Sequence, residues 1–193
     1  MSMKGIFLIA SSILAFAAYV TYISAILKKE ARPHRTTRLV TFIITALATV
    51  SLFAEKNQVA IWLTGIFALN SFIIFILSLN YGMGGWKKID VICLIIALIG
   101  ICLWKLTENP SLALYSSIAA EFTGVVPTLI KIYRYPKTEV WSFFAITGFA
   151  ALFSLFAIKN WNPTEFAYPL YSVCIDLITV LLIIRPTPNR LTK

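Results

Sequence analysis

The sequence predicts an all-α, multi-pass membrane protein in which seven transmembrane helices form two parallel three-helix repeats joined by a linker helix. Composition is the first indication, because 59% of the 193 residues are hydrophobic and the mean hydropathy is +0.84. A soluble domain is only roughly half apolar. The second indication is a set of long apolar runs, such as 72–79 and 91–103, which lack the alternation of a membrane β-strand. The third is an internal repeat.

Seven apolar stretches are each long enough to cross a bilayer as a helix, which takes roughly 17 to 25 residues. They cover residues 5–27, 38–54, 59–79, 89–106, 112–130, 140–158 and 166–184. Together they occupy nearly the whole chain, which leaves no room for a soluble catalytic domain. We interpret the first stretch as a helix rather than a signal peptide, because it can span and the strongest positive charge follows it.

A seven-residue segment of the first half returns in the second half. Residues 51–57 and 154–160 agree at six of seven positions, and Pro33 and Pro136 precede the two copies at the same distance. An internal repeat is a stronger guide to the fold than any local motif. The sequence therefore predicts a first three-helix repeat at 1–80, a linker helix at 81–111 and a second three-helix repeat at 112–193.

The charges predict the orientation in the membrane. The segments that fall on one side carry a net charge of +10, and the segments on the other side carry +1. The basic side consists of residues 28–38, 80–90, 131–139 and the tail from 185. By the positive-inside rule, the N-terminus lies outside and the C-terminus is cytoplasmic, in the cell or inner membrane. The net charge of +9 therefore calls for no nucleic-acid partner.

Residue types that support metal or cofactor chemistry are scarce. The only histidine, His34, lies in a basic loop, where a solvated side chain is expected, and no paired cysteines accompany it to bind zinc. Cys93, Cys102 and Cys174 fall inside predicted spans, so we interpret them as apolar fillers rather than a disulfide framework. The glycine-rich segment 80–85 lacks the lysine and hydroxyl residue of a phosphate loop and is predicted to be a flexible turn. The sequence thus predicts no enzyme, no metal and no cofactor.

Threonines recur every four residues along the second predicted span, at Thr41, Thr45 and Thr49. They share one helical face. Because a threonine hydroxyl usually bonds back to its own helix, we predict that this stripe serves helix packing rather than pore lining.

Three strongly polar side chains are predicted at mid-membrane depth: Asn70, Glu121 and Asp176. Ionisable groups at that depth are costly, so they face a cavity or a partner. The alternative is that both acids are neutral, hydrogen-bonded contacts between helices. Extending the repeat places Asn70 opposite Asp176, which would bring both to the centre of one cavity about a pseudo-twofold axis. Whether Glu121 faces the cavity or a neighbouring protomer stays open.

The fifth predicted helix is the richest chemically. Glu121, Gly124 and Thr128 fall on one of its faces at helical spacing. Pro127 cannot donate to the carbonyl of Thr123, so it predicts a kink and a hinge near the membrane centre.

With three helices, an unpaired linker helix and three more, the chain resembles the SWEET sugar facilitators of the PQ-loop (MtN3) transporter superfamily; the nicotinamide riboside facilitators share this plan. In that family an asparagine on the third helix and another on the seventh flank the substrate. Asn70 matches the first, whereas Asp176 stands at the place of the second. Pro127-Thr128 occupies the place of the family's Pro-Gln on helix five.

The chain also departs from the pattern of this family. The family has hinge prolines on helices one, two, five and six, and only the fifth is retained here, with Ser24-Ala25 at the equivalent place on the first. An acid at 176 suits a cationic or amine-bearing substrate, or a coupled proton, better than a neutral sugar.

The resulting prediction is a transporter, either a facilitator or a proton-coupled carrier, of a small polar metabolite such as a sugar, amino acid, amine or vitamin. It would alternate access around Asn70 and Asp176, with Glu121 and Thr128 lining or gating the cavity and Pro127 as hinge. The alternative is a non-transporting receptor or assembly factor that binds a partner or anionic lipid through its basic loops. The predicted partners are a small-molecule substrate and the lipid bilayer; association into a homo-oligomer stays open.

Overall fold

The computed structural model describes residues 3–54, 60–85, 87–106, 110–158, 161 and 163–186. This part of the chain is helical and contains no β-strand beyond one isolated bridge between His34 and Met83. Its elements are α1 (Met3–Leu27), α2 (Arg35–Ala54), α3 (Ala60–Tyr81), α4 (Lys88–Leu106), α5 (Pro110–Arg134), the 3₁₀-helix η1 (Pro136–Thr138), α6 (Trp141–Ala157) and α7 (Pro163–Ile184). The prediction of an all-α fold with seven helices is confirmed, with helix ends shifted by a few residues.

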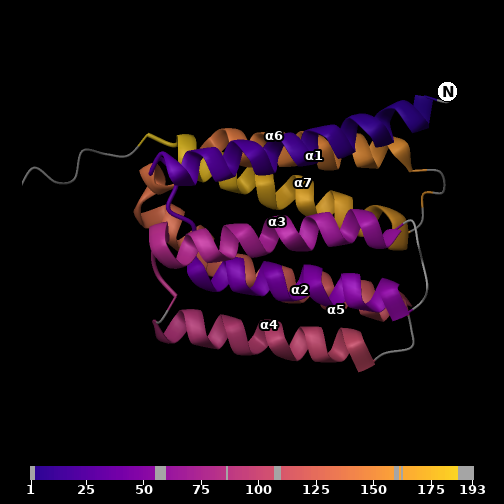
Figure 1. The fold of residues 1–193 in the computed structure, drawn as a ribbon, viewed down its shortest axis with the longest axis horizontal. Helices are drawn as coiled ribbons and strands as arrows, with labels where there is room; N and C mark the ends of the chain where they lie inside the picture. Colours follow the sequence, from indigo (N-terminus) through magenta and orange to yellow (C-terminus); the bar gives the residue numbers. More distant parts are fainter. Residues whose placement is uncertain are drawn as a thin grey trace, which may run out of the picture.

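The seven helices lie side by side, and successive helices reverse direction (Figure 1). In the first half α3 packs against both α1 and α2, and in the second half α7 packs against both α5 and α6. The halves meet where α1 packs on α6 and where α2 packs on α5. The helix α4 lies at the outer edge, against α5 and α2 (Figure 1).

Many large apolar side chains of these helices point outward instead of into a core. They include Ile13 on α1, Ile99 on α4, Phe149 on α6 and Leu177 on α7, each more than half exposed. Within the described residues, Met3–Leu27 and Glu165–Ile184 have the length and apolarity to cross a membrane, with mean hydropathies of 2.1 and 2.0. Shorter apolar helices cover Gly65–Tyr81 and Trp141–Ala157.

The buried core lies between α1 and α6, near the C-terminal end of α1. The ring of Tyr22 stacks on Phe143 with centroids 4.2 Å apart, and Phe144 meets the Phe143 ring edge-on at 4.9 Å. Small residues of α1, Ala18 and Ala25, are buried in the same cluster. Their size allows the two helices to approach closely and leaves room for the aromatic rings.

The loops at the basic end of the molecule are packed against one another. Met83 bonds through its backbone to Pro33 and Arg35. Gly84 has a φ of +74°, and a Cβ atom there would lie 2.3 Å from Nε2 of His34. Only glycine fits both the backbone and the space at this position. The segment therefore forms a packed connection between α3 and α4, while its predicted flexibility stays a prediction.

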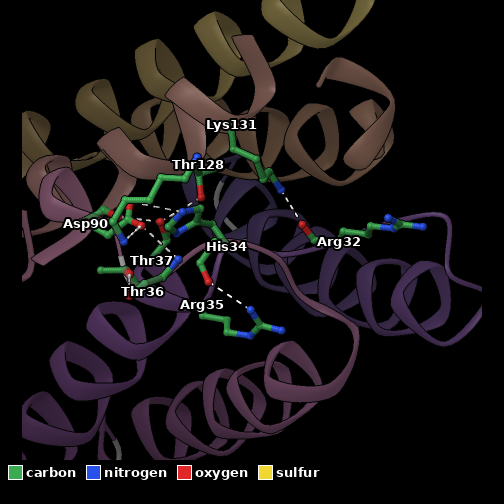
Figure 2. A network of polar contacts seen from close by, with 12 residues as sticks. Arg32, His34, Arg35, Thr36, Thr37, Asp90, Thr128 and Lys131 are labelled. Carbon is green, nitrogen blue, oxygen red and sulfur yellow. Dashed lines mark hydrogen bonds and ion pairs between the residues drawn. The ribbon is translucent and has the colours of Figure 1, made fainter. Parts of the chain in front are cut away.

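The side chain of His34 is buried, which corrects its prediction as a solvated loop residue. Its Nε2 lies 3.4 Å from Oδ1 of Asp90 (Figure 2). The other carboxylate oxygen of Asp90 accepts backbone N–H bonds from Gly85 and Lys87, both at 3.0 Å. The bond to Lys87 caps the first turn of α4, so Asp90 ties that helix to the loop.

Candidate functional site: a central polar cavity

A cavity of about 460 Å³ lies among the helices, and every α-helix except α4 contributes described residues to its lining. Its walls carry hydroxyl groups and aromatic rings from both halves of the chain. The charged groups that line it are Arg38, Glu121 and Asp176. A concave site of this size, with a few polar groups converging on it, can enclose a small molecule.

The structure brings together three of the residues predicted for substrate binding. Glu121 and Thr128 from α5 and Asp176 from α7 all line the cavity. Asn70 is half-buried on α3 and is not part of the lining, to which α3 contributes Phe67. The pairing of Asn70 with Asp176 across the cavity stays a prediction. Pro127 is fully buried and α5 continues as a helix through it.

Each cavity acid lies beside a group that positions it. Asp176 packs against Gly148 on α6, where a Cβ atom would lie 3.3 Å from the Cβ of the acid, and it interacts with the hydroxyl of Thr147. Glu121 interacts with the hydroxyl of Tyr168 on α7. The two carboxyls are near enough to repel each other. A bound cation or proton would relieve that repulsion.

The threonines of α2 line the cavity as well. The hydroxyls of Thr41 and Thr45 donate to carbonyls one turn back, at 2.9 and 3.0 Å. That bonding matches the expectation, yet both residues belong to the cavity wall, so the prediction of packing instead of lining is wrong. The hydroxyl of Thr41, which donates to its own helix, keeps lone pairs for a ligand. The side chain of Thr49 lies outside the described residues.

Arg38 is a cavity residue that sequence reasoning missed, because it was counted among the basic loop residues. Its Nη2 donates to the hydroxyl of Tyr22 at 2.9 Å. The guanidinium lies 4.6 Å from the centroid of the Tyr22 ring and 5.7 Å from that of Phe143. A signal for this role was present, since Arg38, Thr41 and Thr45 fall on one face of a helix.

A buried polar layer lies between this cavity and the basic loops. The hydroxyl of Tyr22 donates to Glu139 at 2.8 Å, and the other oxygen of Glu139 pairs with Lys131. The Lys131 ammonium also donates to the carbonyl of Arg32 at 2.6 Å (Figure 2). Tyr22, Glu139 and Lys131 are each at most 5% exposed, so this layer closes the α1–α6 side of the cavity at the basic end.

A second closure joins α2 to α5 at the same end. The hydroxyl of Thr37 donates to the carbonyl of Gly124 at 2.6 Å and accepts from the hydroxyl of Thr128 at 2.8 Å (Figure 2). Pro127 lacks an N–H for the carbonyl of Thr123. The carbonyl of Gly124, which accepts the hydrogen bond from Thr37, is the next one along the chain. The contact between α2 and α5 therefore lies where Pro127 removes a backbone hydrogen bond of α5.

The far end of the cavity joins the two halves through α1 and α6. Ser11 and Ser154 are hydrogen-bonded at 2.8 Å, and both line the cavity.

A second proline inside a helix, Pro169, lies in α7 one residue after Tyr168. Sequence reasoning missed this proline.

The described residues contain no group of three or more histidine, cysteine, aspartate or glutamate side chains that could hold a metal ion. The groups that the cavity wall presents are charges, hydroxyls and aromatic rings. Comparisons of the chain with protein-family models, with curated proteins and with solved structures find no match.

Proposed function

We propose that this protein is a membrane transporter, a facilitator or proton-coupled carrier, for a small polar metabolite. The observation that carries the proposal is the cavity between the two halves, which Glu121 and Asp176 line from α5 and α7. Both acids are half-buried and have no ion-pair partner within 4 Å among the described residues. Acids in such an apolar setting are expensive and mark substrate or proton pathways.

The outward-facing apolar side chains support seven membrane spans. Two helices qualify by length and composition, and the exposed faces of α4 and α6 are also rich in large apolar residues. Exposing these apolar surfaces to water would cost free energy, whereas lipid chains would cover them at no such cost. We therefore propose a multi-pass protein with an outside N-terminus and a cytoplasmic C-terminus, as the positive-inside rule indicates.

The order of helix packing supports a duplicated architecture with resemblance to SWEET and PQ-loop proteins. The third helix of each proposed repeat lies between the other two, and the contact of α1 with α6 corresponds to that of α5 with α2. The helix α4 has no counterpart, as a linker would. Two related halves around one cavity are suited to alternating access, in which they rock about the bound substrate.

The closed end of the cavity fits one state of such a cycle. To release a substrate to the basic side, the protein would have to separate α1 from α6 and α2 from α5. That movement would break the Tyr22–Glu139 and Thr37–Gly124 hydrogen bonds. Polar contacts can reform at low net cost, because water replaces the lost partners when the end opens.

The alternative of a receptor or assembly factor assigns function to the basic loops at 32–38 and 134–137. Part of that charge is used internally, since Arg38 is buried and Arg35 donates to the carbonyls of Ser78 and Gly84. Fewer basic groups are thus available to a partner than the sequence implies, which favours the transporter.

The first experiment is a thermal-stability screen of the purified full-length protein against sugars, amino acids, amines and vitamins, at one acidic and one neutral pH. A ligand raises the melting temperature by mass action. Each stabilising compound is then offered in radiolabelled form to liposomes that contain the protein. We expect Asp176→Ala to abolish uptake, while insertion and folding are retained.

Glu30→Gln provides the matched control, because Glu30 is an exposed acid of the basic end. It should transport as wild type does. Full uptake by Asp176→Ala would show that the central-site proposal is wrong. Silence across the whole screen, with Asp176→Asn as stable as wild type, would favour the partner-binding alternative.

A further inference from the structure

We propose that the cavity takes a small zwitterion of the amino-acid type, with its carboxylate bound by Arg38 and its ammonium group by Asp176. This inference rests on the proposed function, because it names the substrate class of the same cavity. It follows from the positions of Arg38 and Asp176, a cation and an acid that line the same cavity without forming an ion pair.

Arg38 is prepared to bind an anionic group. Its side chain is buried, and its Nε has no hydrogen-bond partner among the described residues. The Tyr22 hydroxyl and the rings of Tyr22 and Phe143 hold the guanidinium in place. A buried donor without an acceptor is costly, and a ligand carboxylate would satisfy it with a charge-assisted bond.

The charge of Arg38 is not cancelled by the polar layer below it. Glu139 is the nearest acid of that layer, and it is already paired with Lys131. The hydroxyl of Tyr22 separates Glu139 from Arg38, donating to the first and accepting from the second. One full positive charge therefore remains at the closed end of the cavity.

Asp176 supplies the complementary charge. Arg38 and Asp176 interact electrostatically, yet within the described part of the chain they form no ion pair within 4 Å. A ligand with both charges would bridge that gap and add no net charge to the cavity. Glu121 is the second acid of the cavity. Each acid has a hydroxyl partner, Tyr168 for Glu121 and Thr147 for Asp176, and Asp176 is the acid that interacts electrostatically with Arg38.

Other substrate classes fit this charge arrangement less well. A neutral sugar would compensate neither Arg38 nor Asp176. A simple amine would pair with Asp176 and leave the arginine facing a like charge. A simple carboxylate would pair with Arg38 and leave Asp176 facing a like charge. The zwitterion is the class in which both Arg38 and Asp176 gain a partner of opposite charge.

The test measures binding to the purified full-length protein with the standard protein amino acids as probes. The amino acid that most raises the melting temperature is then compared with two relatives: its carboxamide, which lacks the carboxylate, and its deaminated acid, which lacks the ammonium. We expect wild type to bind the amino acid at least about tenfold more tightly than either relative, the factor set by one charge-assisted contact.

The variants separate the two contacts. Arg38→Gln should lose the preference over the carboxamide and keep the preference over the deaminated acid, and Asp176→Asn should do the opposite. Arg38→Lys keeps the positive charge without the guanidinium, so it should retain a weakened preference and serves where Arg38→Gln fails to fold. Arg134→Gln is the matched control, since Arg134 is exposed at the end of α5, and it should bind as wild type does.

The inference is wrong if no amino acid shifts the melting temperature, if wild type binds the carboxamide equally well, or if the Arg38 variants keep full discrimination. Its failure differs from failure of the proposed function. If a sugar requires Asp176 for binding and uptake, the transporter proposal stands and the zwitterion proposal is wrong. If an amino acid binds through Arg38 and never crosses the membrane, the zwitterion proposal stands and the transporter proposal is wrong.

Discussion

At the scale of single residues, the basic side chains of this protein serve two different purposes. Some are exposed at the loop end and contribute to its positive charge: Lys28, Lys29 and Lys137. Arg38 and Lys131 are buried and act through specific partners. An arginine suits the first buried position, because a planar guanidinium stacks on aromatic rings, and a lysine suits the second, because its ammonium meets a carboxylate and a carbonyl as a point charge.

His34 is a residue whose burial has a measurable consequence. Burial lowers the pKa of its imidazole to about 4, against the opposing effect of Asp90. In the unfolded chain the pKa is about 6.5. As the pH falls from about 6.5 to about 4, the unfolded state therefore takes up a proton that the folded state does not. We expect the melting temperature of the purified protein to fall over this range, and to fall less in His34→Gln.

The comparison of the two pH profiles isolates the histidine from the carboxyl groups that also titrate on acidification. Both proteins would be measured in the same detergent from neutral pH downward. Parallel profiles would contradict the assignment of a neutral, buried imidazole to His34.

At the scale of elements, the helices pack through small residues at defined places. Gly124 on α5 faces Val40 on α2, and a Cβ atom at position 124 would lie 2.6 Å from Cγ1 of Val40. The carbonyl of the same glycine accepts the hydrogen bond from Thr37. The absence of a side chain therefore allows both the close approach and the polar contact between these helices.

Gly124→Ala is expected to destabilise the protein by about 1 to 3 kcal/mol, because the β-branched Val40 cannot rotate away from the added methyl group. Removing the obstacle should restore stability, so Gly124→Ala with Val40→Ala should melt above Gly124→Ala alone. Val40→Ala by itself is the control and should lose only the packing of its methyl groups. If Gly124→Ala melts at the wild-type temperature, the contact between α2 and α5 is not as close as described.

At the scale of the whole molecule, the loops of the basic end form one packed layer. The loops of the basic end are tied to one another by backbone bonds, such as Arg32 to Thr138 and Met83 to Pro33. These bonds link the first half of the chain to α4 and to the second half. An alternating-access cycle would therefore have to rearrange this end as a unit.

The proposed orientation predicts which side of a membrane each end faces. Lys137→Cys and Trp161→Cys place single thiols at exposed positions of opposite ends, in a background without Cys93, Cys102 and Cys174. A membrane-impermeant maleimide should label Trp161→Cys in intact cells and Lys137→Cys only after the membrane is opened. The reverse pattern would invert the topology, and labelling of both thiols in intact cells would refute a membrane crossing by α6, the helix between them.

Sequence alone determined the all-α fold class of this protein and the position of its helices along the chain. Hydropathy is a property of each residue and its near neighbours, so seven apolar runs predicted seven helices with ends a few residues away from those observed. Two acids in apolar runs, Glu121 and Asp176, could be identified in the same way, and the structure brings both to the cavity.

Tertiary structure decided which faces of these helices meet. The spacing of Arg38, Thr41 and Thr45 puts them on one face of α2. What that face meets depends on how α2 is rotated against α5, so only the structure shows that these three residues line the cavity. The burial of His34 likewise required a second loop that is distant in sequence. The contacts that shape the cavity join residues far apart in the chain, as Ser11 and Ser154 do, and local sequence carries no record of such pairings.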